Sequence, residues 1–272
     1  MVTNQKMMSK ILSLGCSYSL KVGKNVGTPA ASIDYLLEQV KYYKSYNINL
    51  DIARIPLKDL LWIMDITQVG RLSKKIPIEF AIDNQTRMIH HSQEKLGTDY
   101  FSFFTENFDE EKSFTKEYIK WWNKENKLHY LKSIEDHIKD YLITIKKIQD
   151  ELIGYDYKMY LMNNTFEGYF YKDNILQHKY SNHNEYKIPD LKNTIKLKDL
   201  YPKLWKDIDL SKFRFYSVDG NQYGGLDEYT IDNFGKDQFM DYEWKDKVSP
   251  FGMHPKNEAQ RSFLNEIILN KL

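Results

Sequence analysis

The sequence predicts one α/β domain built on a mainly parallel sheet, because β-prone runs alternate with helical periodicity along its 272 residues. A short apolar run at residues 10–14 closes on Gly15, which is typical of a buried strand followed by a turn. Apolar residues at helical spacing then follow Ser32 and predict a helix over about 33–46. Sheets of this kind are covered by helices on both faces, so we expect a three-layer α/β/α sandwich over residues 1–272.

The elements after residue 50 follow from the same reasoning. Residues 56–66 resemble a helix that begins on proline, and residues 76–82 a strand that leads into a polar loop. Residues 131–152 keep their apolar side chains on one face and stop near Gly154, which predicts the longest helix of the chain. Residues 159–162 are then expected to form a further strand.

The last third of the chain contains a long segment without clear periodicity. Residues 165–212 are rich in Tyr, Asn, Lys and Asp, which indicates an irregular insertion over the edge of the sheet rather than core, and segments of this kind often form lids or contact surfaces. Residues 257–272 place apolar side chains on one face and predict a closing helix packed on the sheet. No repeat or linker is evident, which favours a single domain.

Charge and hydropathy exclude several classes of function. Lys and Arg number 39 against 38 Asp and Glu, a formal charge of +1 that attracts neither nucleic acid nor an anionic membrane. Basic clusters interleaved with stacking aromatic residues are also lacking, so no nucleic-acid partner is expected. The apolar stretches are too short for a membrane span or a classical signal peptide.

Cysteine and histidine usage argues against a disulfide and a metal site. Cys16 is the single cysteine, so neither an intrachain disulfide nor a cysteine-based zinc cluster is expected. The adjacent His90 and His91 would point apart, and neither they nor the pair His178 and His183 have a carboxylate at ligand spacing. A nucleotide-binding protein is disfavoured because no glycine-rich phosphate loop follows a predicted strand.

Three polar residues lie where predicted elements end or begin. Ser17 follows the first strand, Asn84 follows the strand at 76–82, and His254 directly precedes the final helix. A serine hydroxyl attacks only when a neighbouring imidazole takes its proton, and the resulting oxyanion needs preorganised N–H donors. These residues could supply the nucleophile, the donor and the base.

Each residue also has a structural alternative. Ser17 could cap a tight turn, Asn84 could be an ordinary turn residue, and His254 could be hydrogen-bonded at a helix start.

Two segments at the start of the chain resemble the SGNH (GDSL-like) hydrolases. Gly15-Cys16-Ser17 is similar to the Gly-Asp-Ser opening of that family, in a variant with cysteine that is common in phage-encoded members. Residues 28–32 resemble the second block, where Ala30 takes the place of the glycine whose backbone N–H binds the oxyanion.

Two later segments extend the resemblance over the chain. Residues 83–88 resemble the third block, in which Asn84 would be the side-chain donor. Residues 252–255 resemble the last block, in which a His-Pro pair bears the general base, here His254. Residues 226–229 are also similar to phage-type members.

The resemblance implies a serine esterase or deacetylase that acts on an acylated carbohydrate, without a cofactor. Ser17 would attack the acyl group, His254 would transfer the proton, and Ala30 and Asn84 would help to hold the oxyanion. The fold implied is the family's sandwich with a flavodoxin-like strand order. Expected partners are a small ester or acylated glycan, and a second copy of the chain or a virion; the expected location is the cytoplasm of an infected host cell or the virion itself.

Two features differ from the family pattern. The family's acid lies three residues before the histidine, where this chain has Phe251, and losing the equivalent carboxylate in a comparable triad lowers turnover about 10⁴-fold. The gap after Ser17 is also too short for the usual helix and second strand. Nearby carboxylates that could replace the acid are Asp241, Glu243 and Asp246.

These differences support an alternative from another class. A non-catalytic phage structural or binding protein could keep the sheet as a scaffold and use residues 165–212 as its contact surface.

Overall fold

The computed structural model describes part of the chain, including most of the residues from 131 onward. The described residues are 10–15, 20, 24–25, 32–45, 56–67, 69, 73–75, 100–102, 120, 124, 127–128, 131–179, 190–218, 220–235, 239–240, 243–244, 247–248 and 254–270.

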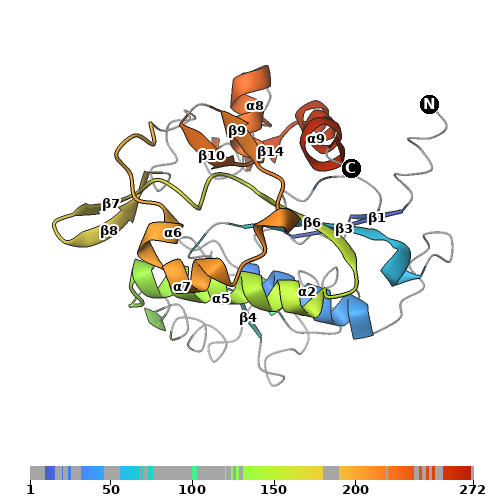
Figure 1. Cartoon of the computed structure of the whole chain (residues 1–272), viewed down its shortest axis with the longest axis horizontal. Coiled ribbons are helices and arrows are strands. Elements are labelled where there is room, and N and C mark those ends of the chain that lie inside the picture. The colour runs from blue at the N-terminus through green and yellow to red at the C-terminus, as the bar shows by residue number, and fades with distance from the viewer. Residues whose placement is uncertain are drawn as a thin grey trace.

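A parallel sheet forms the centre of the molecule (Figure 1). Its neighbouring strands follow the order β2-β1-β3-β6, and all three pairs are parallel. The described residues therefore confirm an α/β fold with a parallel sheet. The strands are β1 (Ile11–Leu14), β2 (Lys24–Asn25), β3 (Leu61–Ile66) and β6 (Asp156–Leu161).

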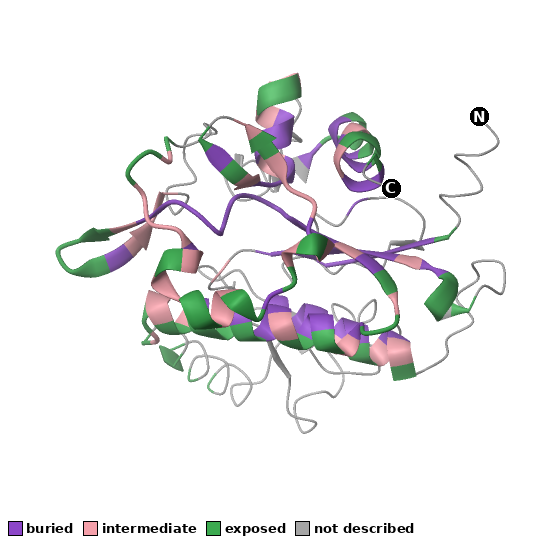
Figure 2. Cartoon of the chain, viewed as in Figure 1, coloured by how far each residue is buried: buried purple, intermediate pink, exposed green. Residues whose placement is uncertain are grey.

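Helices lie on both sides of this sheet (Figure 1). Helices α2 (Ile33–Ser45) and α5 (Ile134–Glu151) pack against each other on one side, whereas α8 (Leu226–Phe234) and α9 (Asn257–Phe263) lie on the other. Strands β1 and β3, the carboxyl half of β6 and the inward faces of the helices are buried, as Figure 2 shows. Such burial explains why β1 and β3 are mostly apolar along their length instead of alternating.

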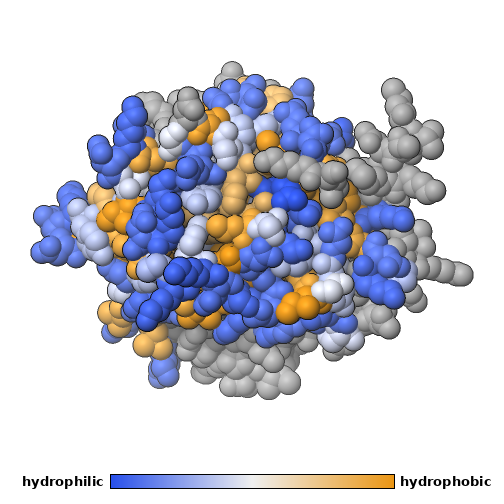
Figure 3. All heavy atoms as spheres, in the orientation of Figure 1, coloured by the Kyte–Doolittle hydropathy of each residue, from blue (hydrophilic) through white to orange (hydrophobic). Residues whose placement is uncertain are grey.

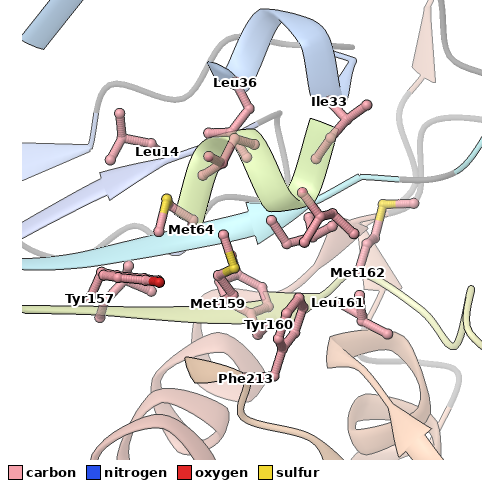
Figure 4. Packing of buried hydrophobic residues seen from close by; sticks show 14 of the residues in the cluster. Leu14, Ile33, Leu36, Met64, Tyr157, Met159, Tyr160, Leu161, Met162 and Phe213 are labelled. Atoms are coloured by element: carbon pink, nitrogen blue, oxygen red, sulfur yellow. The ribbon is translucent and has the colours of Figure 1, made fainter. Parts of the chain in front are cut away.

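Side chains from both helical layers interlock with the sheet. Leu36 of α2 gathers with Leu14 and Met64 on one side (Figure 4). On the other side, the ring of Tyr160 meets the ring of Phe263 edge-on at a centroid distance of 5.5 Å. Tyr160 therefore links β6 to α9.

The helices predicted at 33–46 and 131–152 are confirmed as α2 and α5. Ser32 precedes α2, and its hydroxyl accepts a hydrogen bond from the N–H of Tyr35 at 3.3 Å. Ser133 is the N-cap of α5 and accepts from the N–H of Asp136 at 3.1 Å. Both bonds satisfy backbone donors that the first helical turn leaves without partners.

The prediction of a helix at residues 56–66 is wrong. Pro56 is followed only by a single 3₁₀ turn, η1 (Leu57–Asp59), and β3 begins at Leu61. The N–H of Leu61 donates to the carbonyl of Lys10 at 2.9 Å, which joins this segment to β1. The run is buried on both faces, and periodicity cannot separate such a strand from a buried helix.

Part of residues 165–212 belongs to the core, which corrects the expectation of an excursion outside it. Phe166 and Leu197 are fully buried. Phe166 also contacts the rings of Trp205 and Phe213 at 5.0 and 5.5 Å. Phe213 forms a parallel bridge with Met159, on the side of β6 away from β3. The sequence pattern does not predict this packing, because the aromatic residues involved are not regularly spaced along the chain.

The rest of that segment is a hairpin and short helices. The hairpin β7 (Tyr169–Lys172) and β8 (Ile175–His178) projects from the body of the molecule (Figure 1). It is followed by α6 (Leu197–Leu200), α7 (Pro202–Lys206) and the 3₁₀ turn η4 (Leu210–Lys212).

Short antiparallel pairs complete the described elements, and α9 continues into a π-helical turn, η6 (Leu264–Leu269), which confirms the closing helix. The strand predicted at 76–82 lies outside the described residues. Among the described helices, none is long and apolar enough to cross a membrane. The pairs are β4 (Ser73–Lys75) with β5 (Tyr100–Ser102), β9 (Tyr216–Val218) with β10 (Asn221–Gly224), β11 (Phe239–Met240) with β14 (His254–Pro255), and β12 (Glu243–Trp244) with β13 (Lys247–Val248).

Candidate functional site

The carboxyl ends of β1, β3 and β6 lie side by side along one edge of the sheet. The register pairs Leu14 with Met64, and Ile66 with Leu161. From β1, the chain forms β2 on one side and then returns past β1 to form β3 on the other. Open α/β sheets bind their ligands at such a switch point.

Gly15 ends β1 in a position that only glycine fits. Its φ is +128°, and a Cβ placed there would lie 2.6 Å from the Cβ of Asp65 and 2.9 Å from its carbonyl oxygen. Residues with a side chain rarely adopt that conformation, and they would also collide with β3. The turn predicted after the first strand therefore begins in tight contact with β3.

Asp65 is a fully buried carboxylate beside this turn. It pairs in register with Tyr160, so both side chains point to the face of the sheet that α9 covers. The sequence analysis does not single out Asp65 as a site residue, because it predicts a helix at residues 56–66 instead of β3. The signal that could have found it is an acid inside an otherwise apolar strand, because such a charge is expensive to bury without a purpose.

Near this edge, three buried side-chain oxygens of described residues have no hydrogen-bond partner within the described part of the chain. They belong to the hydroxyls of Ser13 and Thr67 and the side-chain carbonyl of Asn163. Thr67 directly follows β3, and Asn163 lies two residues beyond β6. Buried polar atoms nearly always have a hydrogen-bond partner. These three oxygens could therefore accept a hydrogen bond from water or from a ligand.

The two described residues that flank the serine segment, Gly15 and Leu20, are held by side chains. The N–H of Gly15 donates to Oε1 of Gln39 in α2 at 3.3 Å. The N–H of Leu20 donates to the hydroxyl of Tyr160 at 3.1 Å. Gln39, Tyr160, Gly15 and Leu20 are all buried.

Most of the predicted catalytic residues lie outside the described residues, so their mutual geometry stays a prediction. The backbone of His254 is described: it lies in β14, pairs with Met240 of β11, and comes shortly before α9. The same holds for the backbone of Glu243, at the start of β12. Outside the described residues are Ser17, Ala30, Asn84, Phe251, Asp241 and Asp246.

The structure corrects one expectation about the segment after Ser17. The length of the gap predicts no second strand, but β2 pairs in parallel with β1 through Leu12 with Lys24 and Ser13 with Asn25. The strand is only two residues long and both residues are polar, so the sequence contains no apolar run that predicts it.

A buried polar network fixes the carboxyl end of β6. The amide of Asn164 donates to Glu167 at 2.7 Å and to Asn221 at 2.6 Å. Glu228 accepts from the N–H groups of Asn164 and Gly225 at 2.9 and 2.6 Å. These bonds tie the residues after β6 to β10 and α8.

The charge of Glu167 is balanced inside the protein. Lys196 lies 2.5 Å from a carboxylate oxygen of Glu167, which is 1% exposed. His178 also belongs to this region: its Nε2 is bonded to the carbonyl of Glu167 at 2.7 Å. This bond ties β8 to the segment that follows β6. Across the described part of the chain, no three His, Cys, Asp or Glu side chains are placed to hold a metal ion.

One cavity lies away from this edge. It has a volume of about 250 Å³ and opens beside the amino end of β6, between α5 and η4. Gln149 lines it and clamps Asp209 by donating to its carbonyl and accepting from its N–H, both at 2.9 Å. Its cations, Lys146 and Lys212, stand among several carboxylates, so the cavity has no dominant charge to select a ligand.

No protein-family model matches the chain, and no curated protein or solved structure is significantly similar to it. The interpretation of the site therefore rests on its own residues.

Proposed function

We propose that the chain is a serine hydrolase of the SGNH type, an esterase or deacetylase acting on an acylated carbohydrate. The observation that carries the proposal is the position of Gly15, the residue at the start of the predicted serine turn, at the end of β1. Numbered along the chain, the strand order is 2-1-3-4, the start of the flavodoxin-like order. Gly15 lies at the switch point of this order, two residues before Ser17.

Two further features support this fold assignment. Helices cover both sides of the sheet, as in a three-layer sandwich (Figure 1). The parallel bridge between Phe213 and Met159 adds chain where a fifth strand would continue the sheet.

In the proposed first step, the hydroxyl oxygen of Ser17 attacks the acyl carbon while His254 takes the hydroxyl proton. The N–H groups of Ser17 and Ala30 and the side-chain amide of Asn84 hold the oxyanion of the tetrahedral adduct. Its collapse breaks the bond to the sugar oxygen, which takes the proton from His254 and leaves as an alcohol. An acyl-serine ester remains.

The second step restores the enzyme. A water molecule gives a proton to His254 and attacks the acyl-serine, and the second adduct releases the carboxylic acid as Ser17 regains its proton. A carboxylate beside the imidazole would stabilise its charged form. Candidates are Asp241, Glu243 and Asp246, and we add Asp65 because it is buried beside Gly15.

Hydrolysis of p-nitrophenyl acetate tests this function. Ser17→Ala should lower turnover by at least about 10³-fold, because the alanine cannot form the acyl intermediate. Ser45→Ala is the control, since Ser45 is exposed at the end of α2 and should leave the rate unchanged. Equal rates for the wild type and Ser17→Ala would refute the proposal. If Ser17→Ala loses activity as expected, a panel of acetylated sugars would identify the natural leaving group.

A second candidate function is a non-catalytic phage structural or binding protein. The projecting β7–β8 hairpin favours it, because Tyr171 and Ile175 are 54% and 63% exposed there. The face shown in Figure 3 is otherwise mainly hydrophilic with small apolar patches. Absence of turnover on every ester, combined with loss of assembly on Ile175→Asp, would favour this function over the hydrolase.

A further inference from the structure

We propose that Gln39 and Tyr160 are positioning residues that hold the serine turn in place for catalysis. The inference rests on the proposed hydrolase function and goes beyond it, since neither residue belongs to the nucleophile, base or oxyanion donors. It comes from the two hydrogen bonds that end the turn, Gly15 to Gln39 and Leu20 to Tyr160.

The two bonds bracket Ser17 closely along the chain. Gly15 and Leu20 enclose only residues 16–19, so fixing both ends limits the positions that the turn can take. The partners come from distant parts of the sequence, 24 residues away for Gln39 and 140 for Tyr160. Each is a side chain that holds a backbone N–H, whereas in a regular strand a neighbouring backbone carbonyl would do so.

The two partners also hold the turn from opposite faces of the sheet. Gln39 projects from α2 on one side, and Tyr160 faces α9 on the other. The Tyr160 ring is itself fixed against Phe263. Asp65 packs directly against Gly15 between them. The turn therefore begins in a rigid frame built from α2, β3 and β6.

Burial separates this role from substrate binding. Gln39 and Tyr160 have no exposed surface, so neither can contact a substrate. Burying a polar amide or phenol is unfavourable unless its hydrogen bonds are made. Their effect on catalysis must therefore be exerted through the backbone that they hold. A displacement of about 1 Å at a reacting group can lower a rate about 10²-fold.

The test uses the full chain and two conservative substitutions. Tyr160→Phe removes the accepting hydroxyl, and Gln39→Met removes the accepting oxygen at nearly constant volume. Each should lower the rate constant of covalent labelling by a fluorophosphonate, and kcat for p-nitrophenyl acetate, about 10- to 100-fold. KM should stay at the wild-type value.

Matched controls remove similar buried bonds elsewhere. Tyr169→Phe deletes the hydroxyl that donates to the carbonyl of Thr165 at 2.8 Å, and Gln149→Met deletes the clamp on Asp209. Both should lower the denaturation midpoint yet be labelled at the wild-type rate. If the controls lose labelling as strongly as Tyr160→Phe and Gln39→Met, the effect is general destabilisation and the proposal fails.

Hydrogen exchange measured by mass spectrometry provides a readout that needs no activity. Peptides covering residues 15–20 should exchange faster in Tyr160→Phe and Gln39→Met than in the wild type or the controls. An active wild type with unchanged labelling in both variants would overturn this inference and leave the hydrolase function standing. A wild type that is never labelled would overturn the function and the catalytic role of both residues. If residues 15–20 still exchanged faster in the two variants of a wild type that is never labelled, Gln39 and Tyr160 would have a structural role only.

Discussion

Alanine at His254 should lower the turnover of p-nitrophenyl acetate by at least about 10³-fold, as alanine at Ser17 should, and the double variant should lose no more than either single one. The nucleophile and the base act as one unit, because the serine hydroxyl is a poor nucleophile unless its proton is accepted. Once either member is missing, the other has nothing left to contribute. Steady-state rates of the three variants, corrected for spontaneous hydrolysis, make the comparison.

His137→Ala provides the control for this prediction. His137 lies in the first turns of α5, on the side of the sheet opposite α9, so its loss should leave turnover unchanged. If His254→Ala retained a tenth of the wild-type activity, or if the losses of the two single variants added up in the double variant, a coupled Ser17–His254 pair would be ruled out.

Alanine at Gly225 should lower the free energy of unfolding by about 4 kcal/mol, an unusually large effect for adding one methyl group. Gly225 is the N-cap of α8, and a Cβ there would lie 2.2 Å from the carbonyl oxygen of Leu161 and 2.7 Å from its carbonyl carbon. Both are backbone atoms at the end of β6, so the strain cannot be relieved by rotating a side chain. Urea denaturation followed by circular dichroism measures the change.

Gly220→Ala separates this steric effect from backbone strain. Gly220 has a φ of +79°, but a Cβ there would meet nothing within 4 Å. The control should therefore cost about 1–2 kcal/mol, the penalty for an L-residue in the left-handed region. If Gly225→Ala were no more destabilising than Gly220→Ala, α8 would not approach β6 as closely as the structure shows.

The elements that the sequence predicted correctly carry a regular pattern and an end signal. Residues 131–152 combine an apolar stripe with Ser133 at the start of α5 and Gly154 beyond its end. Strand β3 lacks such a pattern, because it is apolar on both faces and Pro56 suggested a helix start. The aromatic core around Phe166 was missed for a related reason: its members come from several loops, so no local period connects them.

For the candidate site, the sequence predicts the turn that begins at Gly15 but not the residues that pack around it. The turn at Gly15 could be predicted because a strand and its glycine are adjacent in the chain. Gln39, Asp65 and Tyr160 could not, because only the sheet register and the packing of α2 bring them to the turn. The hydrogen bond from the N–H of Asn164 to Glu228 joins two segments that lie 64 residues apart in the sequence.

Covalent labelling of the wild type by a fluorophosphonate tests the central claim most directly, because it requires an activated serine and no knowledge of the substrate. Tryptic digestion should place the label on the peptide of residues 11–21, and fragmentation should assign it to Ser17 rather than to Ser13 or Ser19. The label should be absent from His254→Ala. A wild-type protein that remains unlabelled, or one labelled at another residue, would contradict the assignment of Ser17 as the nucleophile.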